Sequence, residues 1–187
     1  MQQYAASSMV GRMIRAARLE NEVYEEVERD KDATTQALTV VVIVAIAAGI
    51  GSALSLLIAG VGIGSAILGL ISGIVGAVVG WAIWSFLTYW IGTSLFGGKA
   101  TYGELLRTIG FAFTPNALGI FSFIPFLGGL IAFVGSIWAL VAAVIAVRQA
   151  LDFDTGKAIL TAIIGWIVLV IIYAVLGALG LGFMMLG

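Results

Sequence analysis

Long stretches without a charged residue divide this chain more clearly than any motif in it. Residues 33–98 and 108–147 contain no Asp, Glu, Lys or Arg, and neither does the stretch from residue 158 to residue 187. A transmembrane helix needs about 20 predominantly apolar residues. The first two stretches are therefore long enough for two spans each, and the third is long enough for one.

The amino-acid composition favours the same class of protein. Hydrophobic residues make up 61% of the chain and charged residues 10%, whereas soluble domains have about 45–50% and about 25%. We therefore expect an all-α, polytopic transmembrane helix bundle.

Glycine and proline indicate where each long stretch divides. Three glycines fall within residues 60–64, and Pro125 is followed closely by Gly128 and Gly129; these residues weaken or end helices. The chain then has two parts, a cytosolic amphipathic segment (1–36) and a membrane domain (37–187). The five expected spans are residues 37–58, 64–91, 108–124, 129–147 and 158–180.

The basic residues predict the orientation of these spans. All nine Lys and Arg lie in the N-terminal segment, near residues 99–107, or near residues 148–157. Five spans place these three regions on one side of the membrane, and positively charged loops face the cytosol. We expect a cytosolic N-terminus and an external C-terminus.

The N-terminal segment has helical periodicity from about residue 8 to residue 30. Its first half combines Met9, Val10, Met13 and Ile14 with Arg12, Arg15 and Arg18, a pattern typical of a helix lying in the interface beside anionic lipid. Its second half is rich in glutamate and should face the protein's own cytosolic loops or a partner. Both a solvated helix packed on the bundle and a dedicated binding surface fit this pattern.

Missing residue types argue against several functions. The chain has no cysteine and no histidine, which removes thiolates, the commonest metal ligand and the commonest general base. No ionisable residue falls inside an expected span, although coupled transporters generally need one there. The net charge of −1 gives no sign of nucleic-acid binding. We expect no enzymatic activity, metal or cofactor.

Two features inside the expected spans are candidate functional or packing sites. Glycines at four positions of the second span would let another helix approach closely, either within the monomer or in a homo-oligomer: Gly69, Gly73, Gly76 and Gly80. Pro115 should bend the third span, and Asn116 beside it is the most polar residue expected at membrane depth. Such a residue is either a contact between helices or part of a polar opening.

The loop before the third span contains a helix-start signal. Thr101 and Glu104 have the spacing of a capping box, and Arg107 is placed to pair with Glu104. A helix should therefore begin in the cytosolic loop and continue into the membrane.

Several stretches resemble the Yip1 domain family. They include Arg107-Thr108-Ile109-Gly110-Phe111-Ala112-Phe113-Thr114-Pro115, Ile137-Trp138-Ala139-Leu140, Ala146-Val147-Arg148-Gln149-Ala150-Leu151 and Gly156-Lys157-Ala158-Ile159. The segment at residues 19–36 is similar to the one before the first span in bacterial members, and the resemblance covers about residues 12–175. It implies five spans with a cytosolic N-terminus.

What the resemblance implies about activity is limited. Eukaryotic members of the family bind prenylated Rab-type GTPases and assist vesicle traffic and membrane shaping. Their long N-terminal region with its acidic aromatic motif is not present in this sequence, so we do not expect GTPase binding to carry over. The short form is similar to prokaryotic members, which implies the plasma membrane, and the family offers no catalytic residues.

These observations favour a membrane organiser, scaffold or accessory subunit. Its partners would be membrane lipids and either another membrane protein or a second copy of the chain. The alternative is a passive channel or carrier for a small or lipidic solute. The candidate cytosolic surface consists of Arg12, Arg15, Arg18, Arg107, Arg148 and Lys157.

Overall fold

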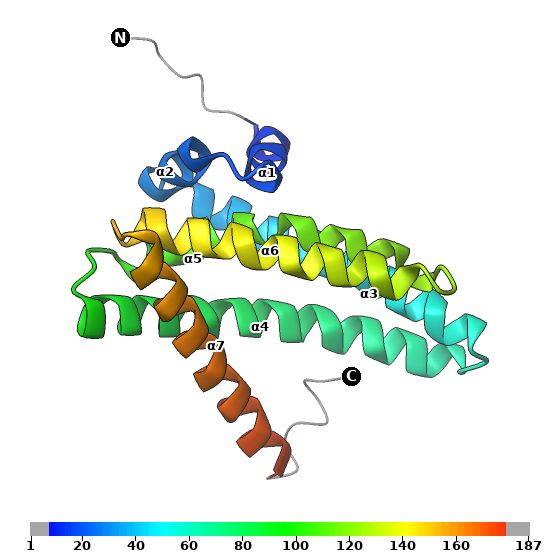
Figure 1. Ribbon diagram of the computed structural model, residues 1–187. Coiled ribbons are helices and arrows are strands. Elements are labelled where there is room, and N and C mark those ends of the chain that lie inside the picture. The colour runs from blue at the N-terminus through cyan, green and yellow to red at the C-terminus, as the bar shows by residue number, and fades with distance from the viewer. Residues whose placement is uncertain (1–7, 179–187) are drawn as a thin grey trace.

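The computed structural model describes residues 8–178, and this part of the chain is helical, as expected, with no strand. Seven α-helices and one 3₁₀-helix follow one another (Figure 1). They are α1 (Met9–Ala17), α2 (Asn21–Arg29), α3 (Ala33–Ile58), α4 (Ile63–Phe96), α5 (Tyr102–Ala112), η1 (Thr114–Phe123), α6 (Gly128–Ala150) and α7 (Thr155–Ala178).

Four of these helices, α3, α4, α6 and α7, are long and apolar enough to cross a membrane. They correspond to four of the five expected spans, and each starts one to four residues earlier than expected. At the other end of α4, Gly97 takes the left-handed conformation (φ 72°) that ends the helix. Residues 179–180 of the last expected span lie outside the described residues.

The expected third span, residues 108–124, is not one α-helix. Pro115 has no N–H to donate to the carbonyl of Phe111, four residues before it. That carbonyl accepts a hydrogen bond from the hydroxyl of Thr114 at 2.7 Å, and the chain continues as the 3₁₀-helix η1, in which the N–H of Asn116 donates to the carbonyl of Phe113 at 2.9 Å. The proline therefore changes the type of helix.

The eight elements are arranged as a bundle with two distinct ends (Figure 1). The α4–α5 and α6–α7 connections lie at one end, and the α3–α4 and η1–α6 connections lie at the other. α5 and η1 together run from the first end to the second, with η1 packed chiefly against α3 and α6. Near its own start, α7 crosses α4, and it then diverges from the other helices.

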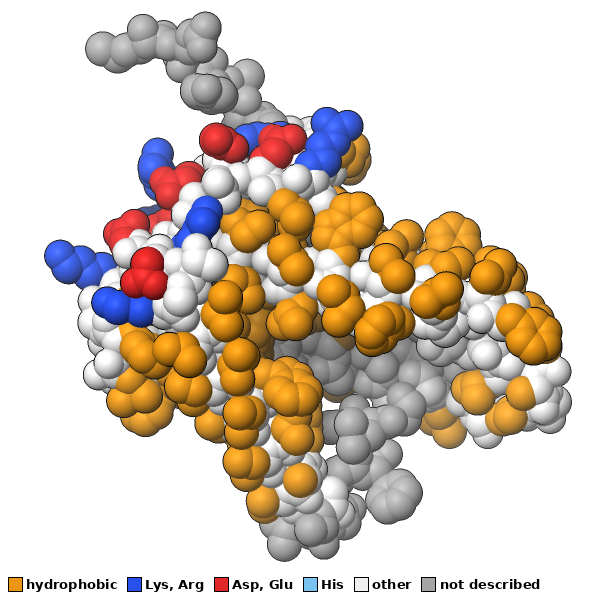
Figure 2. Space-filling model, in the orientation of Figure 1, with side chains coloured by type: hydrophobic (Ala, Val, Ile, Leu, Met, Phe, Trp, Pro, Cys, Tyr) orange, Lys and Arg blue, Asp and Glu red, His pale blue; other side chains and the backbone are white. Residues whose placement is uncertain are grey.

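The first two helices form a cap, defined here as α1 and α2, on one side of the bundle. The sequence predicted one helix over residues 8–30, but the chain turns at Leu19, whose φ is 62°. This turn brings α2 back beside α1 and against α5 and α6. Figure 2 shows the charged side chains gathered over the cap and the adjoining end of the bundle, with hydrophobic side chains over the rest of the visible face.

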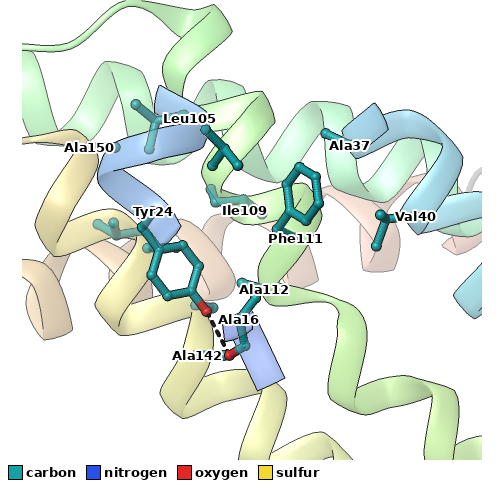
Figure 3. Close-up of a cluster of buried hydrophobic side chains, with 14 of the residues drawn as sticks. Ala16, Tyr24, Ala37, Val40, Leu105, Ile109, Phe111, Ala112, Ala142 and Ala150 are labelled. Atoms are coloured by element: carbon teal, nitrogen blue, oxygen red, sulfur yellow. Dashed lines mark hydrogen bonds between the residues drawn. The ribbon is translucent and has the colours of Figure 1, made fainter. Parts of the chain in front are cut away.

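The best-packed part of the core lies between the cap and the bundle. Tyr24 of α2 and Leu105, Ile109 and Phe111 of α5 are all completely buried. Figure 3 shows these side chains together, with the hydroxyl of Tyr24 donating to the carbonyl of Ala16 in α1 at 3.2 Å. The cap is thus part of the hydrophobic core.

Glycine allows α3 to approach η1 and α5 very closely. A Cβ on Gly51 would lie 2.2 Å from the carbonyl oxygen of Gly119, and a Cβ on Gly110 would lie 2.7 Å from the Cβ of Ala37. A methyl group has no room at either position, so the seam between α3 and the α5–η1 segment depends on these glycines.

Candidate functional site

Arg12 joins the two helices of the cap. Only 2% of its side chain is exposed, and its guanidinium contacts Glu26 at 2.9 Å, Asp30 at 2.7 Å and the side-chain oxygen of Gln36 at 3.0 Å. These contacts use its donors in a fork geometry suited to carboxylates. The hydrogen bond from Arg12 holds the pKa of Asp30 below its usual range.

Arg15 continues this network at the cap surface. It pairs with Glu20 at 2.9 Å and with Glu26 at 2.6 Å, so Glu26 accepts from both arginines. The prediction that the first-half arginines face anionic lipid is wrong for Arg12 and Arg15. α2 supplies carboxylates at short distance, and these pairs satisfy the arginines inside the protein.

Arg107 attaches the cap to the membrane helices. The side chain is 6% exposed, and its Nε donates to the carbonyl of Val27 at 2.9 Å, while Nη2 donates to the carbonyl of Glu28. Both carbonyls belong to the last turn of α2, where main-chain acceptors have no partner within the helix. Nη1 reaches the hydroxyl of Thr34 at 3.4 Å. The predicted pair between Arg107 and Glu104 is not formed.

Glu104 instead completes the predicted capping box. Its Oε2 accepts from the N–H of Thr101 at 2.7 Å, and its own N–H donates to the hydroxyl of Thr101 at 3.4 Å. The predicted helix start is therefore confirmed: Thr101 is the N-cap residue, and α5 begins at Tyr102. The box fixes where α5 begins, and Arg107 lies later in the same helix, where it contacts the end of α2.

The remaining predicted cations occupy three different environments. Arg148 is half-buried and donates to the side-chain oxygen of Asn21 at 2.9 Å, which links α6 to α2. Lys157 is exposed, with its Nζ 5.7 Å from the centre of the Phe153 ring. Arg18 is exposed at the end of α1, and no ion pair of Arg18 is found among the described residues. The six cations therefore do not form one surface.

Glu28 lies where acidic groups from several elements approach each other. Its pKa is raised to about 7, chiefly by burial and in part by the nearby charges of Glu104, Glu25 and Asp152, against a lowering effect of Arg29. The carboxylate of Glu28 therefore changes charge near neutral pH at the junction of the cap and the loops.

At membrane level the structure is less tightly packed, with two cavities on either side of Asn116. One, of about 340 Å³, is lined by α4, α6 and α7 residues, and the other, of about 330 Å³, by α3 residues and η1. Ala77, Phe113 and Asn116 line both cavities. Asn116 thus contributes to the lining of both cavities, and Pro115 is buried at the second position of η1.

Each cavity is also lined by a residue with an unsatisfied polar atom. The indole N–H of Trp84, in the first, and the hydroxyl of Ser122, in the second, are buried without a hydrogen-bond partner among the described residues. Buried polar atoms are usually paired. These two groups are therefore exceptions, each enclosed by neighbouring atoms beside a cavity.

The glycine ladder of α4, which is the set Gly69, Gly73, Gly76 and Gly80, does not act as one packing surface. A Cβ on Gly80 would lie 2.9 Å from the hydroxyl of Tyr173 in α7, whereas a Cβ on Gly73 would meet nothing within 4 Å. Gly76 lines the cavity beside Trp84, and Gly69 is half-buried. Packing within the monomer thus involves Gly80, and Gly73 faces outward.

Sequence reasoning did not single out the residues that form the tightest seam. Gly51, Gly110 and Gly119 lack the four-residue spacing that marked the ladder, so no pattern distinguished them. Asn21 and Gln36, which bind Arg148 and Arg12, gave no signal because their partners are distant in the sequence.

Comparison with known proteins identifies the family of the chain. A family model of the Yip1 domain matches residues 20–177. No curated protein and no solved structure matches the chain. The matched residues extend from the start of α2 through almost all of α7, and the chain belongs to the Yip1 domain family.

Proposed function

We propose that this chain is a non-enzymatic organiser of a prokaryotic plasma membrane, acting as a scaffold or accessory subunit through its cytosolic cap and lateral helix contacts. The observation that supports this most is the attachment of the cap. Arg107 and Arg12, both buried, hold α1 and α2 against the bundle, so partners would meet a surface of fixed shape. A scaffold needs such a surface and needs no reactive group.

We also propose that the chain crosses the membrane five times, with the N-terminus in the cytosol and the C-terminus outside. At about 1.5 Å per α-helical and about 2 Å per 3₁₀ residue, the eleven residues of α5 and ten of η1 span roughly 35 Å. That exceeds the roughly 30 Å hydrocarbon thickness of a bilayer. Irregular backbone at membrane depth is tolerated where protein surrounds it, and α3 and α6 flank η1.

Single cysteines test this topology cleanly, because the chain has none of its own. Variants Val61→Cys, Lys99→Cys, Phe126→Cys and Asp154→Cys would be treated with a membrane-impermeant maleimide on intact cells. Five spans predict labelling at positions 61 and 126 and protection at 99 and 154. If the α5–η1 segment does not cross, position 126 becomes protected and position 154 becomes labelled.

The scaffold role is tested by photo-cross-linking in the native membrane. A photo-reactive residue at two exposed positions, Glu22 in the cap and Lys31 just after it, should capture one defined protein in near-stoichiometric yield. The same residue at Val61, on the opposite connection, is the matched control. Lipid adducts alone at all three positions would contradict the scaffold proposal.

The two cavities that meet at Asn116 favour a second candidate, a passive carrier for a small or lipidic solute. Asn116→Leu would then abolish flux into proteoliposomes, whereas Asn116→Ser would preserve it, and thermal stability would change little. If Asn116 serves only to hold helices together, Asn116→Leu would lower the unfolding temperature in detergent and no flux would be found in either protein.

A further inference from the structure

A third membrane-level cavity lies beneath the first helix of the cap. It has a volume of about 420 Å³ and is lined by one face of α1 together with Ile43 of α3, Thr114 of η1 and Trp138 of α6. Small-molecule sites commonly measure about 300–1,000 Å³. Ile43 and Trp138 lie near the middle of their helices, so the cavity extends from the cap toward the apolar part of the bundle.

The lining of this cavity is apolar with one cation. Val10 and Ile14, 58% and 48% exposed, form its α1 side. The hydroxyl of Thr114 is already used by the carbonyl of Phe111. Arg18 both lines the cavity and is exposed, so it stands at the opening.

The neighbouring arginines show why Arg18 differs. Arg12 and Arg15 are held by carboxylates of the cap. Glu20, the carboxylate nearest to Arg18 along the chain, is itself paired with Arg15. Within residues 8–178, Arg18 makes no ion pair and no side-chain hydrogen bond, which leaves its guanidinium available to an external anion.

A cation at the opening of an apolar cavity is complementary to an anionic amphiphile. We propose that this cavity binds an anionic phospholipid of the cytosolic leaflet, with its phosphate at Arg18 and an acyl chain between α1 and the membrane helices. Guanidinium is well suited to phosphate, and exposed apolar residues of an interfacial helix insert beside acyl chains. This inference rests on the proposed orientation, because it places the cap in the cytosolic headgroup region.

The test uses purified full-length chain and two lipids with identical acyl chains, phosphatidylglycerol and phosphatidylcholine, titrated in detergent and followed by native mass spectrometry. One cation at the headgroup accounts for about a fivefold preference for a lipid of net negative charge over a lipid of no net charge. We expect the wild type to prefer phosphatidylglycerol by about this factor, Arg18→Lys to keep the preference and Arg18→Gln to lose it. Lys31→Gln, another exposed cation of the cytosolic region, is the control and should keep it.

The acyl-chain part of the proposal has its own variant. Val10→Gln should weaken binding of both lipids by a similar factor, roughly threefold, and leave their ratio unchanged, whereas Val61→Gln on the opposite connection should change neither. The proposal is overturned if Arg18→Gln retains the preference, if Lys31→Gln loses it equally, or if Val10→Gln binds like the wild type. None of these outcomes depends on whether the cap also recruits a protein.

Discussion

The cap end of the bundle and its membrane-level half differ in whether their buried polar groups have hydrogen-bond partners. At the cap end, Arg12 of α1 and Arg107 of α5 are almost completely buried, and each donates to at least two acceptors. At membrane level, Trp84 and Ser122 each keep a buried polar atom without a partner, beside two cavities that meet at Asn116. One region is fixed by satisfied polar contacts, and the other keeps space and unused hydrogen-bonding capacity.

This difference suggests a division of labour within one fold. A buried cation must be matched closely by its surroundings, since leaving it unpaired is costly. The cap therefore has one well-defined position against the bundle. Helices that meet through small apolar residues in lipid carry no such requirement, so cavities can persist between them. Substitutions in each region test whether the two regions differ in this way.

The largest effect should come from Arg107→Met. The change keeps much of the side-chain volume but leaves the carbonyls of Val27 and Glu28 without their donor. Because unsatisfied buried acceptors cost about 1–3 kcal/mol each, we expect the free energy of unfolding in detergent to fall by about 3 kcal/mol. Protease sensitivity of residues 18–32 should rise with it. Lys99→Met, an exposed cation on the adjoining loop, is the control. A loss below about 1 kcal/mol for Arg107→Met would mean that Arg107 contributes little to holding the cap in place.

A smaller but still large effect is expected at the seam between α3 and η1. In Gly51→Ala the new methyl group would lie 2.2 Å from the main-chain oxygen of Gly119, so one element must move, at about 2 kcal/mol. Gly73→Ala is the matched control, because nothing lies within 4 Å of that Cβ and alanine favours a helix by up to about 1 kcal/mol. The two variants should shift the unfolding temperature in opposite directions. Equal shifts of the unfolding temperature in the two variants would show that α3 and η1 can move apart without loss of stability.

These two regions also explain how far the sequence could predict the structure. The uncharged stretches located α3, α4, α6 and α7 to within a few residues, because an apolar run of that length is readable without knowing its neighbours. The capping box at Thr101 was equally local. Both features depend on residues close together in the chain.

What escaped prediction depends on partners distant in the sequence. Arg107 was assigned to Glu104, three residues away, whereas it reaches Val27 and Thr34 across eighty and seventy-three positions. Likewise the regularly spaced glycines of α4 attracted attention, but the closest approach involves Gly51 and Gly119. Helical spacing reveals which residues share a face and does not reveal which helix covers it. The five-span topology and the scaffold role remain predictions.

The acidic junction of the cap should respond to pH. The pKa of Glu28 rises from 4.5 to about 7 in the folded protein, so the folded state favours the protonated form. The stabilisation from this group is complete below about pH 4.5 and is lost as the pH rises through about 7. Since the side chain is only half-buried, the solvent-screened effect should be about 1 kcal/mol. Glu28→Gln should match the wild type near pH 4.5 and be more stable at pH 8 in a detergent unfolding series. Glu22→Gln, at an exposed position, should show no such divergence. Parallel stability curves for the wild type and Glu28→Gln would mean that Glu28 does not make stability depend on pH.

The smallest effect on stability is expected at Gly73, where the membrane-level half presents glycine to its surroundings. A leucine there meets open space in the monomer, so the free energy of unfolding should change only through helix propensity, by less than about 1 kcal/mol. The scaffold proposal includes lateral contacts between copies. If these contacts use the face of Gly73, the leucine would block close helix approach. The dimer fraction measured by single-molecule photobleaching in lipid vesicles would then fall. Val75→Leu, exposed two residues further along the helix, should leave that fraction unchanged. A dimer fraction unaltered by Gly73→Leu would exclude this face from lateral contacts, and the cap would then be the remaining surface through which the chain could organise its neighbours.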